Sequence, residues 1–224
     1  MTLQRTFTRL LAFSIILIGG AGMARATMLS DLLNPGQTIQ VGDLLFSNFT
    51  YLQTGDMPTA STVNVTPFTS LAGDNGLMIQ GAFTDLPGNA GSDALVTYRV
   101  TELTPGVTIT SAALAGNPSV VGGSGIVSGT ESFLPTNTTD TMNIFSGSPG
   151  STQLSNSLSF GPGFTSLDVQ NSVLAFAIDG APTLSFFTPT FHTVSNPIPE
   201  PASVTLVGMA VGTLAWRRIR RKRS

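Results

Sequence analysis

Residues 93–103 of this 224-residue chain read DALVTYRVTEL, and apolar and polar side chains alternate along the stretch. A period of two residues is typical of a β-strand with one face in a core and the other in water. The face expected in the core carries Ala94, Val96, Tyr98 and Val100. Pro105-Gly106 follows directly and predicts a tight turn into a second strand over residues 107–116.

The same pattern of short strands separated by Gly and Pro continues in both directions from this stretch. Further strands are expected within residues 38–52 (two, around Gly42-Asp43), 76–83, 125–133, 141–147, 152–160, 165–178 and 182–191. One or two helical turns are expected at residues 27–36, ending at Asn34-Pro35-Gly36. About ten to twelve short strands with no long helical period predict an all-β, antiparallel β-sandwich of jelly-roll type, formed by residues 27–194.

The charge of this central region is strongly negative. Eleven acidic residues and a single cation, Arg99, lie between Thr27 and Ile198, so with His192 neutral the net charge is 1 − 11 = −10. A surface this poor in Lys and Arg cannot neutralise phosphates, which excludes nucleic acid as a partner and disfavours binding to anionic lipid. Arg99 itself is expected to pair with Glu102 or another acid near the sheet surface.

The residues for common catalytic chemistry are largely missing. The chain has no cysteine, which excludes a thiol nucleophile and cysteine-built zinc sites, and His192 is its only histidine. A serine triad would need Ser and Asp to converge on His192, and no Gly-x-Ser-x-Gly motif supports one. We therefore expect His192 to be a packed or surface residue, and we expect no enzyme, no catalytic residue and no bound cofactor or metal.

Two alternatives remain open at this point. Glu102, Glu131, Asp93 and Asp168 could supply the carboxylate pair of a glycoside hydrolase. The aromatic side chains that usually grip sugars are few, because the central region has no Trp and only two tyrosines, Tyr51 and Tyr98.

Calcium is the second alternative. Oxygen ligands stand on Gly-rich turns at Asp74-Asn75 and at Asn89 and Asp93. Neither turn matches an EF-hand loop, and Asp and Asn beside Gly are also ordinary turn residues.

The N-terminus has the layout of a secretory signal peptide. Arg5 and Arg9 precede the apolar stretch LLAFSIILIGGAG, and small residues stand at Ala24 and Ala26. This order predicts an N-terminal signal helix over residues 1–26 and cleavage after Ala26.

The C-terminus carries a second short apolar segment, within residues 195–224. A helix over the thirteen residues from Val204 to Trp216 would be about 20 Å long, which is short of a bilayer core of about 30 Å. Pro201 blocks its extension toward the N-terminus. A basic cluster follows the segment and would stay in the cytoplasm; it comprises Arg217, Arg218, Arg220, Arg221, Lys222 and Arg223. The segment is therefore expected to insert in the membrane only transiently.

The three-part order of Pro199-Glu200-Pro201, an apolar run and a basic end resembles a PEP-CTERM sorting signal, a tag on exported proteins of Gram-negative bacteria that typically make exopolysaccharide. The resemblance covers only about the last 26 residues. It implies that an exosortase, a membrane-embedded cysteine transpeptidase, recognises Pro199, Glu200 and Pro201 and cuts near them.

These observations together predict an exported protein. After processing by signal peptidase and exosortase, it is expected at the cell surface or in the extracellular matrix, past the inner membrane, with a non-enzymatic structural or adhesive role. Exopolysaccharide is its expected partner. A carbohydrate-binding module, with or without calcium, is the main alternative, and a glycoside hydrolase with two carboxylates is a weaker one.

Overall fold

A computed structural model describes residues 26–88, 90–134 and 141–195. The expected signal helix and C-terminal apolar helix lie outside these residues. So do Asn89, Ala24, the Pro199-Glu200-Pro201 motif and the basic cluster from Arg217 to Arg223. In the residues described, no helix has the length and apolar character needed to span a membrane.

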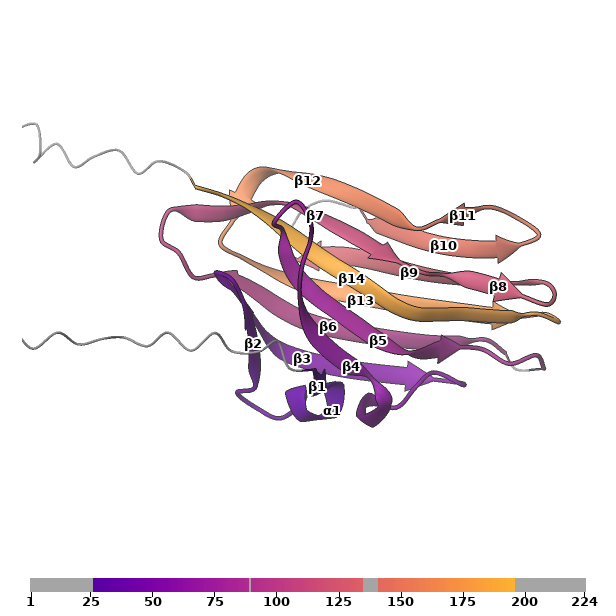
Figure 1. Cartoon of the computed structure of the whole chain (residues 1–224). Helices are drawn as coiled ribbons and strands as arrows, with labels where there is room; N and C mark the ends of the chain where they lie inside the picture. Colours follow the sequence, from indigo (N-terminus) through magenta and orange to yellow (C-terminus); the bar gives the residue numbers. More distant parts are fainter. Residues whose placement is uncertain (1–25, 89, 135–140, 196–224) are drawn as a thin grey trace, which may run out of the picture.

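The described chain is almost entirely β-structure (Figure 1). In chain order the elements are β1 (Thr27–Met28), α1 (Leu29–Leu32), β2 (Thr38–Val41), β3 (Leu44–Thr54), the short 3-10 helix η1 (Ala60–Thr62), β4 (Asn64–Thr69), β5 (Asn75–Thr84), β6 (Ser92–Glu102), β7 (Val107–Gly116), β8 (Ser119–Val121), β9 (Gly125–Leu134), β10 (Met142–Ser148), β11 (Thr152–Gln153), β12 (Ser155–Phe164), β13 (Ser166–Ala177) and β14 (Ala181–Ser195).

These strands form two seven-stranded antiparallel sheets that pack face to face (Figure 1). Sheet A has the order β1-β4-β5-β14-β7-β12, with β8 also paired to β14, and sheet B has the order β11-β10-β9-β13-β6-β3-β2. Along the chain, β5, β7, β12 and β14 lie in sheet A and β6, β9, β10 and β13 lie in sheet B, so the chain crosses between the two sheets several times. The predicted antiparallel β-sandwich is confirmed.

The core lies between the sheets and follows the alternation seen in the sequence. Ala94, Val96 and Val100 are fully buried and Tyr98 is almost so, whereas Arg99 between them is exposed. The same rule places aromatic rings from both sheets in contact, such as Phe46 of β3 with Phe191 of β14. Burial of these alternate side chains is what holds the two sheets together in a chain without disulfides.

The structure adds strands to those expected, because some are too short or too irregular to recognise in the sequence. There are fourteen strands among the described residues, and β1, β8 and β11 have only two or three residues each. β4 was not expected. It contains Pro67, which has no N–H to donate, but β1 pairs only with Asn64 and Val65 of β4, so no strand of the described chain on that side needs a donor at Pro67. The helix expected at residues 27–36 is a single turn, α1.

The last two strands of the chain occupy central positions. β13 lies between β6 and β9 in sheet B, and β14 lies between β5 and β7 in sheet A. β14 therefore brings His192, near its end, beside the turn between β4 and β5.

Candidate functional site

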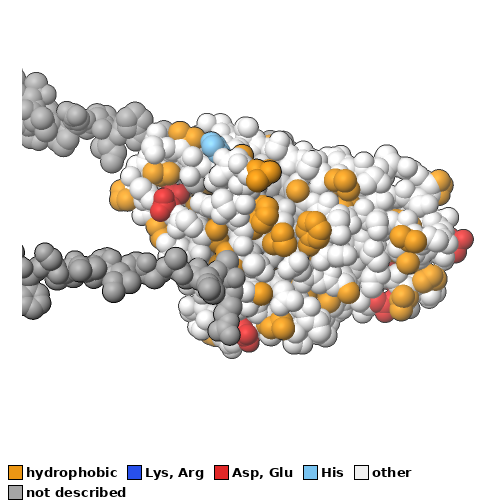
Figure 2. Space-filling model, in the orientation of Figure 1, with side chains coloured by type: hydrophobic (Ala, Val, Ile, Leu, Met, Phe, Trp, Pro, Cys, Tyr) orange, Lys and Arg blue, Asp and Glu red, His pale blue; other side chains and the backbone are white. Residues whose placement is uncertain are grey.

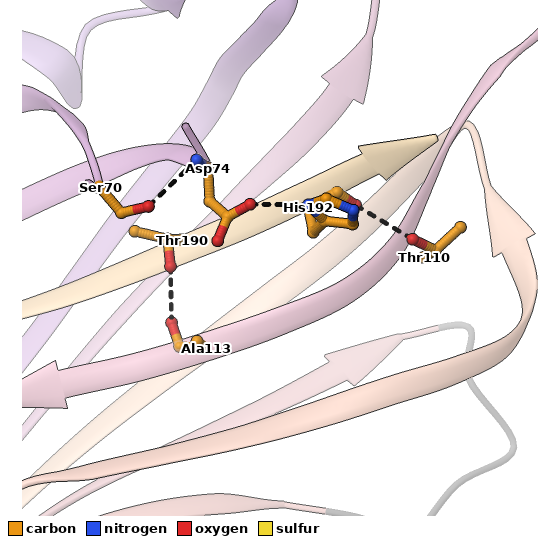
Figure 3. A network of polar contacts seen from close by, with 6 residues as sticks. All are labelled: Ser70, Asp74, Thr110, Ala113, Thr190 and His192. Atoms are coloured by element: carbon orange, nitrogen blue, oxygen red, sulfur yellow. Dashed lines mark hydrogen bonds and ion pairs between the residues drawn. The ribbon is translucent and has the colours of Figure 1, made fainter. Parts of the chain in front are cut away.

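The only histidine of the chain forms a polar cluster at the end of β14 (Figure 3). His192 Nδ1 lies 2.7 Å from Asp74 Oδ1, in the turn that joins β4 to β5. The turn holds Asp74 in place, because its backbone N–H donates to Ser70 Oγ at 3.1 Å and Ser70 N donates back to the Asp74 carbonyl at 2.8 Å. The His192 side chain is 53% exposed and that of Asp74 23%.

This pair can orient an imidazole but does not by itself form a catalytic site. A carboxylate at Nδ1 favours the tautomer with the proton on Nδ1, which leaves Nε2 as an acceptor. Ser111 of β7 lies directly across from His192 in the sheet. Among the contacts of the described chain, no hydrogen bond joins the Ser111 and His192 side chains. Asp74 and His192 are therefore in contact with each other, but His192 does not activate Ser111 as a triad would. His192 is a surface residue, as expected.

The Asp74–His192 contact is expected to contribute modestly to stability. In a double-mutant cycle of Asp74→Ala and His192→Ala at neutral pH, we expect a coupling free energy of at most about 1 kcal/mol, because both groups remain in contact with water. Urea unfolding of the four proteins measures it. A coupling of several kcal/mol would show that the pair is part of a larger network.

A second polar cluster lies inside the sandwich. Glu131 of β9 is fully buried, and neither of its carboxylate oxygens has a hydrogen-bond partner among the described residues. Directly across on β13 is Asn171, which is 2% exposed and whose Oδ1 also lacks a described partner. Two neighbouring strands thus bring three unpaired oxygen acceptors into one part of the core.

Burial determines the protonation of this cluster. Removal from water raises the pKa of Glu131 well above its ordinary range, because a low-dielectric core disfavours the carboxylate. The pKa of Tyr98 is also raised, mainly by burial and secondly by the charge of nearby Glu131. The Tyr98 hydroxyl accepts a hydrogen bond of 3.5 Å from Asn171 Nδ2. A neutral Glu131 carries an O–H donor that a carboxylate lacks, and Asn171 Oδ1 is a suitable acceptor on the facing strand.

The only cation of the central region pairs on the outer face of sheet B. Arg99 Nε and Nη2 donate to the two oxygens of Asp168 at 2.7 and 2.8 Å, in a bidentate pair on neighbouring strands. The hydrogen bond from Arg99 is the main cause of the lowered pKa of Asp168. Arg99 thus pairs with an acid at the sheet surface, as expected, and that acid is Asp168 rather than Glu102.

The structure does not bring the candidate carboxylates together as a glycosidase pair. Glu131 of β9 faces Asn171 of β13, which in turn faces Val96 of β6. Glu102 lies six residues beyond Val96 along β6. At about 3.3 Å per residue the two glutamates are separated by about 20 Å along the strands, well beyond the 5–10 Å of a glycosidase pair. Of the two aspartates, Asp168 is engaged by Arg99, and Asp93 accepts a hydrogen bond from Ser172.

The Asp74-Asn75 turn, one of the two considered for calcium, uses its side-chain oxygens within the protein; the other turn contains Asn89, which lies outside the described residues. Asp74 contacts His192, and Asn75 Oδ1 accepts from Thr69 Oγ1 at 3.0 Å. Within residues 26–88, 90–134 and 141–195, no three His, Cys, Asp or Glu side chains are grouped as metal ligands. The ordinary turn interpretation of Asp74-Asn75 therefore accounts for their contacts.

The faces of the sandwich offer no tyrosine platform for a sugar. Tyr98 is buried in the core, and Tyr51 is partly buried and donates to the Pro58 carbonyl at 2.6 Å, with burial raising its pKa to about 12. Charged side chains are sparse and lie near the margins of the face seen in Figure 2. Small side chains stand side by side on β7 and β12, at Ala115 and Ser155. An exposed aromatic ring on the outer face of sheet B is that of Phe176, at 41%.

Comparison with known proteins adds little to this geometry. No family model and no curated protein matches the chain. One solved structure that matches is the enzymatically active domain of tailspike protein 4 from bacteriophage CBA120, with 16% identity and a TM-score of 0.29; the match covers 65% of this chain and 20% of that chain.

One prediction is corrected by this comparison. The expectation that the protein is not an enzyme is contradicted, since the matching chain is described as an enzymatically active domain, and we withdraw that expectation. A TM-score of 0.29 assigns neither a fold nor an activity to the present chain.

Proposed function

We propose that this protein is an exported bacterial surface or matrix protein, delivered by its signal peptide and sorted by an exosortase through its C-terminal tag. Its β-sandwich has a structural or adhesive role, and exopolysaccharide is the partner class. Signal peptidase and exosortase act on the two ends and leave the sandwich at the cell surface or outside the cell.

The observation that carries this proposal is the extent of the sandwich. Strand pairing starts at Thr27, opposite Val65, and Thr27 is the first residue after the expected cleavage position at Ala26. Pairing ends at Ser195, opposite Val107, and three residues then separate Ser195 from Pro199. Both expected processing points therefore fall outside the strands of the described residues, so removal of both ends would leave each of these strands intact.

Charge also favours this proposal. The ends carry nine of the ten Lys and Arg residues, and the region between them has a net charge of −10. A strongly acidic domain stays soluble and resists non-specific association with anionic cell components, which suits an exported protein.

Processing of the tag is tested by mass spectrometry of the exported protein. We expect the recovered chain to begin at Thr27 and to lack the residues beyond about Pro201, including Trp216. A Glu200→Ala variant should accumulate with its tag attached, whereas Thr193→Ala, in the last strand, should be processed normally. Recovery of Trp216 in the exported wild-type chain would refute sorting by this tag.

A further inference from the structure

The lateral edges of the two sheets differ in how much backbone they expose. β1 and β11 have two residues each and β2 has four, which leaves β3 unpaired on the β2 side beyond Ser47, whereas β12 at the edge of sheet A has ten. Within the described chain β12 pairs only with β7. Natural sheets usually protect a long edge with charged side chains, Lys above all, because an open edge can pair with another strand.

The register shows which backbone groups of β12 face away from the sheet. Gly116 N of β7 donates to the Leu154 carbonyl at 2.9 Å, and hydrogen-bonded and non-hydrogen-bonded pairs alternate from there along an antiparallel ladder. Asn156 and Leu158 therefore direct their backbone groups to β7. The N–H and C=O groups that point outward belong to Ser155, Ser157 and Ser159.

Side-chain amides occupy two of these outward groups. Ser157 N donates to Asn156 Oδ1 at 2.8 Å, and Gln153 Nε2 donates to the Ser155 carbonyl at 3.2 Å. Both contacts are exposed and connect close neighbours in the chain. They can be exchanged for backbone hydrogen bonds from an incoming strand without loss of buried contacts.

This edge is also free of charge, unlike the rest of the domain. No charged residue occurs from Thr141 to Leu167, a stretch that includes β10, β11 and β12, although the region from Thr27 to Ile198 has a net charge of −10. Two copies of the protein repel each other wherever acidic surfaces approach, and least along this edge.

The serines of the edge are placed symmetrically about Ser157. Residues 155–159 read Ser-Asn-Ser-Leu-Ser, and the three serines are exposed. In an antiparallel pair of two such strands centred on Ser157, Ser155 of one copy stands opposite Ser159 of the other. The serines would then face serines, and Asn156 of one copy would stand opposite Leu158 of the other; the small serine side chains leave the strands free to approach.

We propose that β12 is a self-association edge, at which a second copy of this chain adds β12 in antiparallel orientation and extends sheet A across a two-fold axis at Ser157. Such a contact uses one surface on both copies, as two-fold dimers do, and its hydrogen bonds run through the backbone. It does not depend on how the ends of the chain are processed.

Proline at position 157 tests the proposal directly. The Ser157 N–H points away from β7, so Ser157→Pro should preserve the fold while removing a donor from the edge. By analytical ultracentrifugation of the exported protein over a wide concentration range, we expect dimers of the wild type, at least tenfold weaker dimerisation of Ser157→Pro, and unchanged dimerisation of the matched control Ser157→Ala. A wild type that stays monomeric, or an unchanged Ser157→Pro, would overturn the proposal.

A cysteine variant gives a second test that does not rely on proline. The chain has no cysteine, so Ser157→Cys introduces a single thiol. Facing residues of a hydrogen-bonded antiparallel pair have Cα atoms about 5.5 Å apart, within the range of a disulfide. Under mild oxidation Ser157→Cys should form a covalent dimer much faster than Thr54→Cys, an exposed control on β3. Equal rates would count against pairing at β12.

Discussion

Replacing Glu131 with glutamine is expected to stabilise the sandwich at neutral and alkaline pH. Glu131 is fully buried and has no described partner for its carboxylate oxygens, and burial raises its pKa well above the ordinary value of 4.5. The folded protein therefore keeps the proton of Glu131 at pH values where the unfolded chain has lost it. Glutamine has nearly the same shape and never ionises.

The direction of the pH dependence follows from proton binding. Above pH 4.5 the folded state holds more protons at Glu131 than the unfolded state, so the free energy of unfolding falls as pH rises toward the folded pKa. The stability supplied by the neutral group is complete below pH 4.5 and decreases by about 1.4 kcal/mol for each pH unit above it. Glu131→Gln should match the wild type in acid and become increasingly more stable than the wild type as the pH rises above 4.5.

Urea unfolding between pH 4.5 and pH 8 measures this difference. Glu102→Gln is the matched control, because Glu102 is also largely buried but one of its oxygens accepts a hydrogen bond of 2.8 Å from Thr104 N. The control should retain the decline in stability with pH that Glu131→Gln removes. Equal pH profiles for Glu131→Gln and the wild type would show that Glu131 is not neutral in the fold.

Phe191→Ala is expected to destabilise the sandwich far more than a substitution on its surface. Phe191 is 1% exposed on the central strand β14, and its ring lies 6.0 Å from that of Phe46 and 6.4 Å from that of Phe133, both in sheet B. Removing it leaves a cavity between the sheets, which costs about 3–5 kcal/mol for a buried phenylalanine. Since the free energy of unfolding of a domain is typically only about 5–15 kcal/mol, this loss would remove a large part of the stability of the fold.

The matched control is Phe176→Ala, on β13, a central strand of the other sheet. Phe176 is 41% exposed on the outer face, so its truncation should cost less than about 1 kcal/mol. Thermal unfolding followed by circular dichroism compares the two variants. Similar losses for both would mean that Phe191 does not join the two sheets as described.

The sandwich could be predicted because its strands obey a simple rule of alternation. Residues 94–100 show which face enters the core, and the many Gly- and Pro-bounded segments indicate two antiparallel sheets. The short pairings of β1, β8 and β11 could not be predicted, because two or three residues carry no detectable period. β4 contains Pro67, which is tolerated only because β1 pairs with Asn64 and Val65 and does not reach Pro67, and the sequence does not show where β1 ends.

The polar sites were harder to foresee than the fold, for two different reasons. Glu131 shares its face of β9 with Val127 and Phe133, so its burial was visible in the alternation, although Glu131 was expected only as a candidate carboxylate of a glycosidase pair. Asp74 and His192 are 118 residues apart, and only the pairing of β5 with β14 brings them together. No local pattern marks such a contact.

The position of β14 has a mechanical consequence for a protein held to a cell by its C-terminus. A pull on the C-terminus would act first on β14, which is flanked along its length by β5 on one side and by β7 and β8 on the other. Force directed along a central strand shears many hydrogen bonds at once, whereas force on an edge strand peels them apart one after another. The order of strands in sheet A would thus place a C-terminal tether on a strand that is paired on both sides.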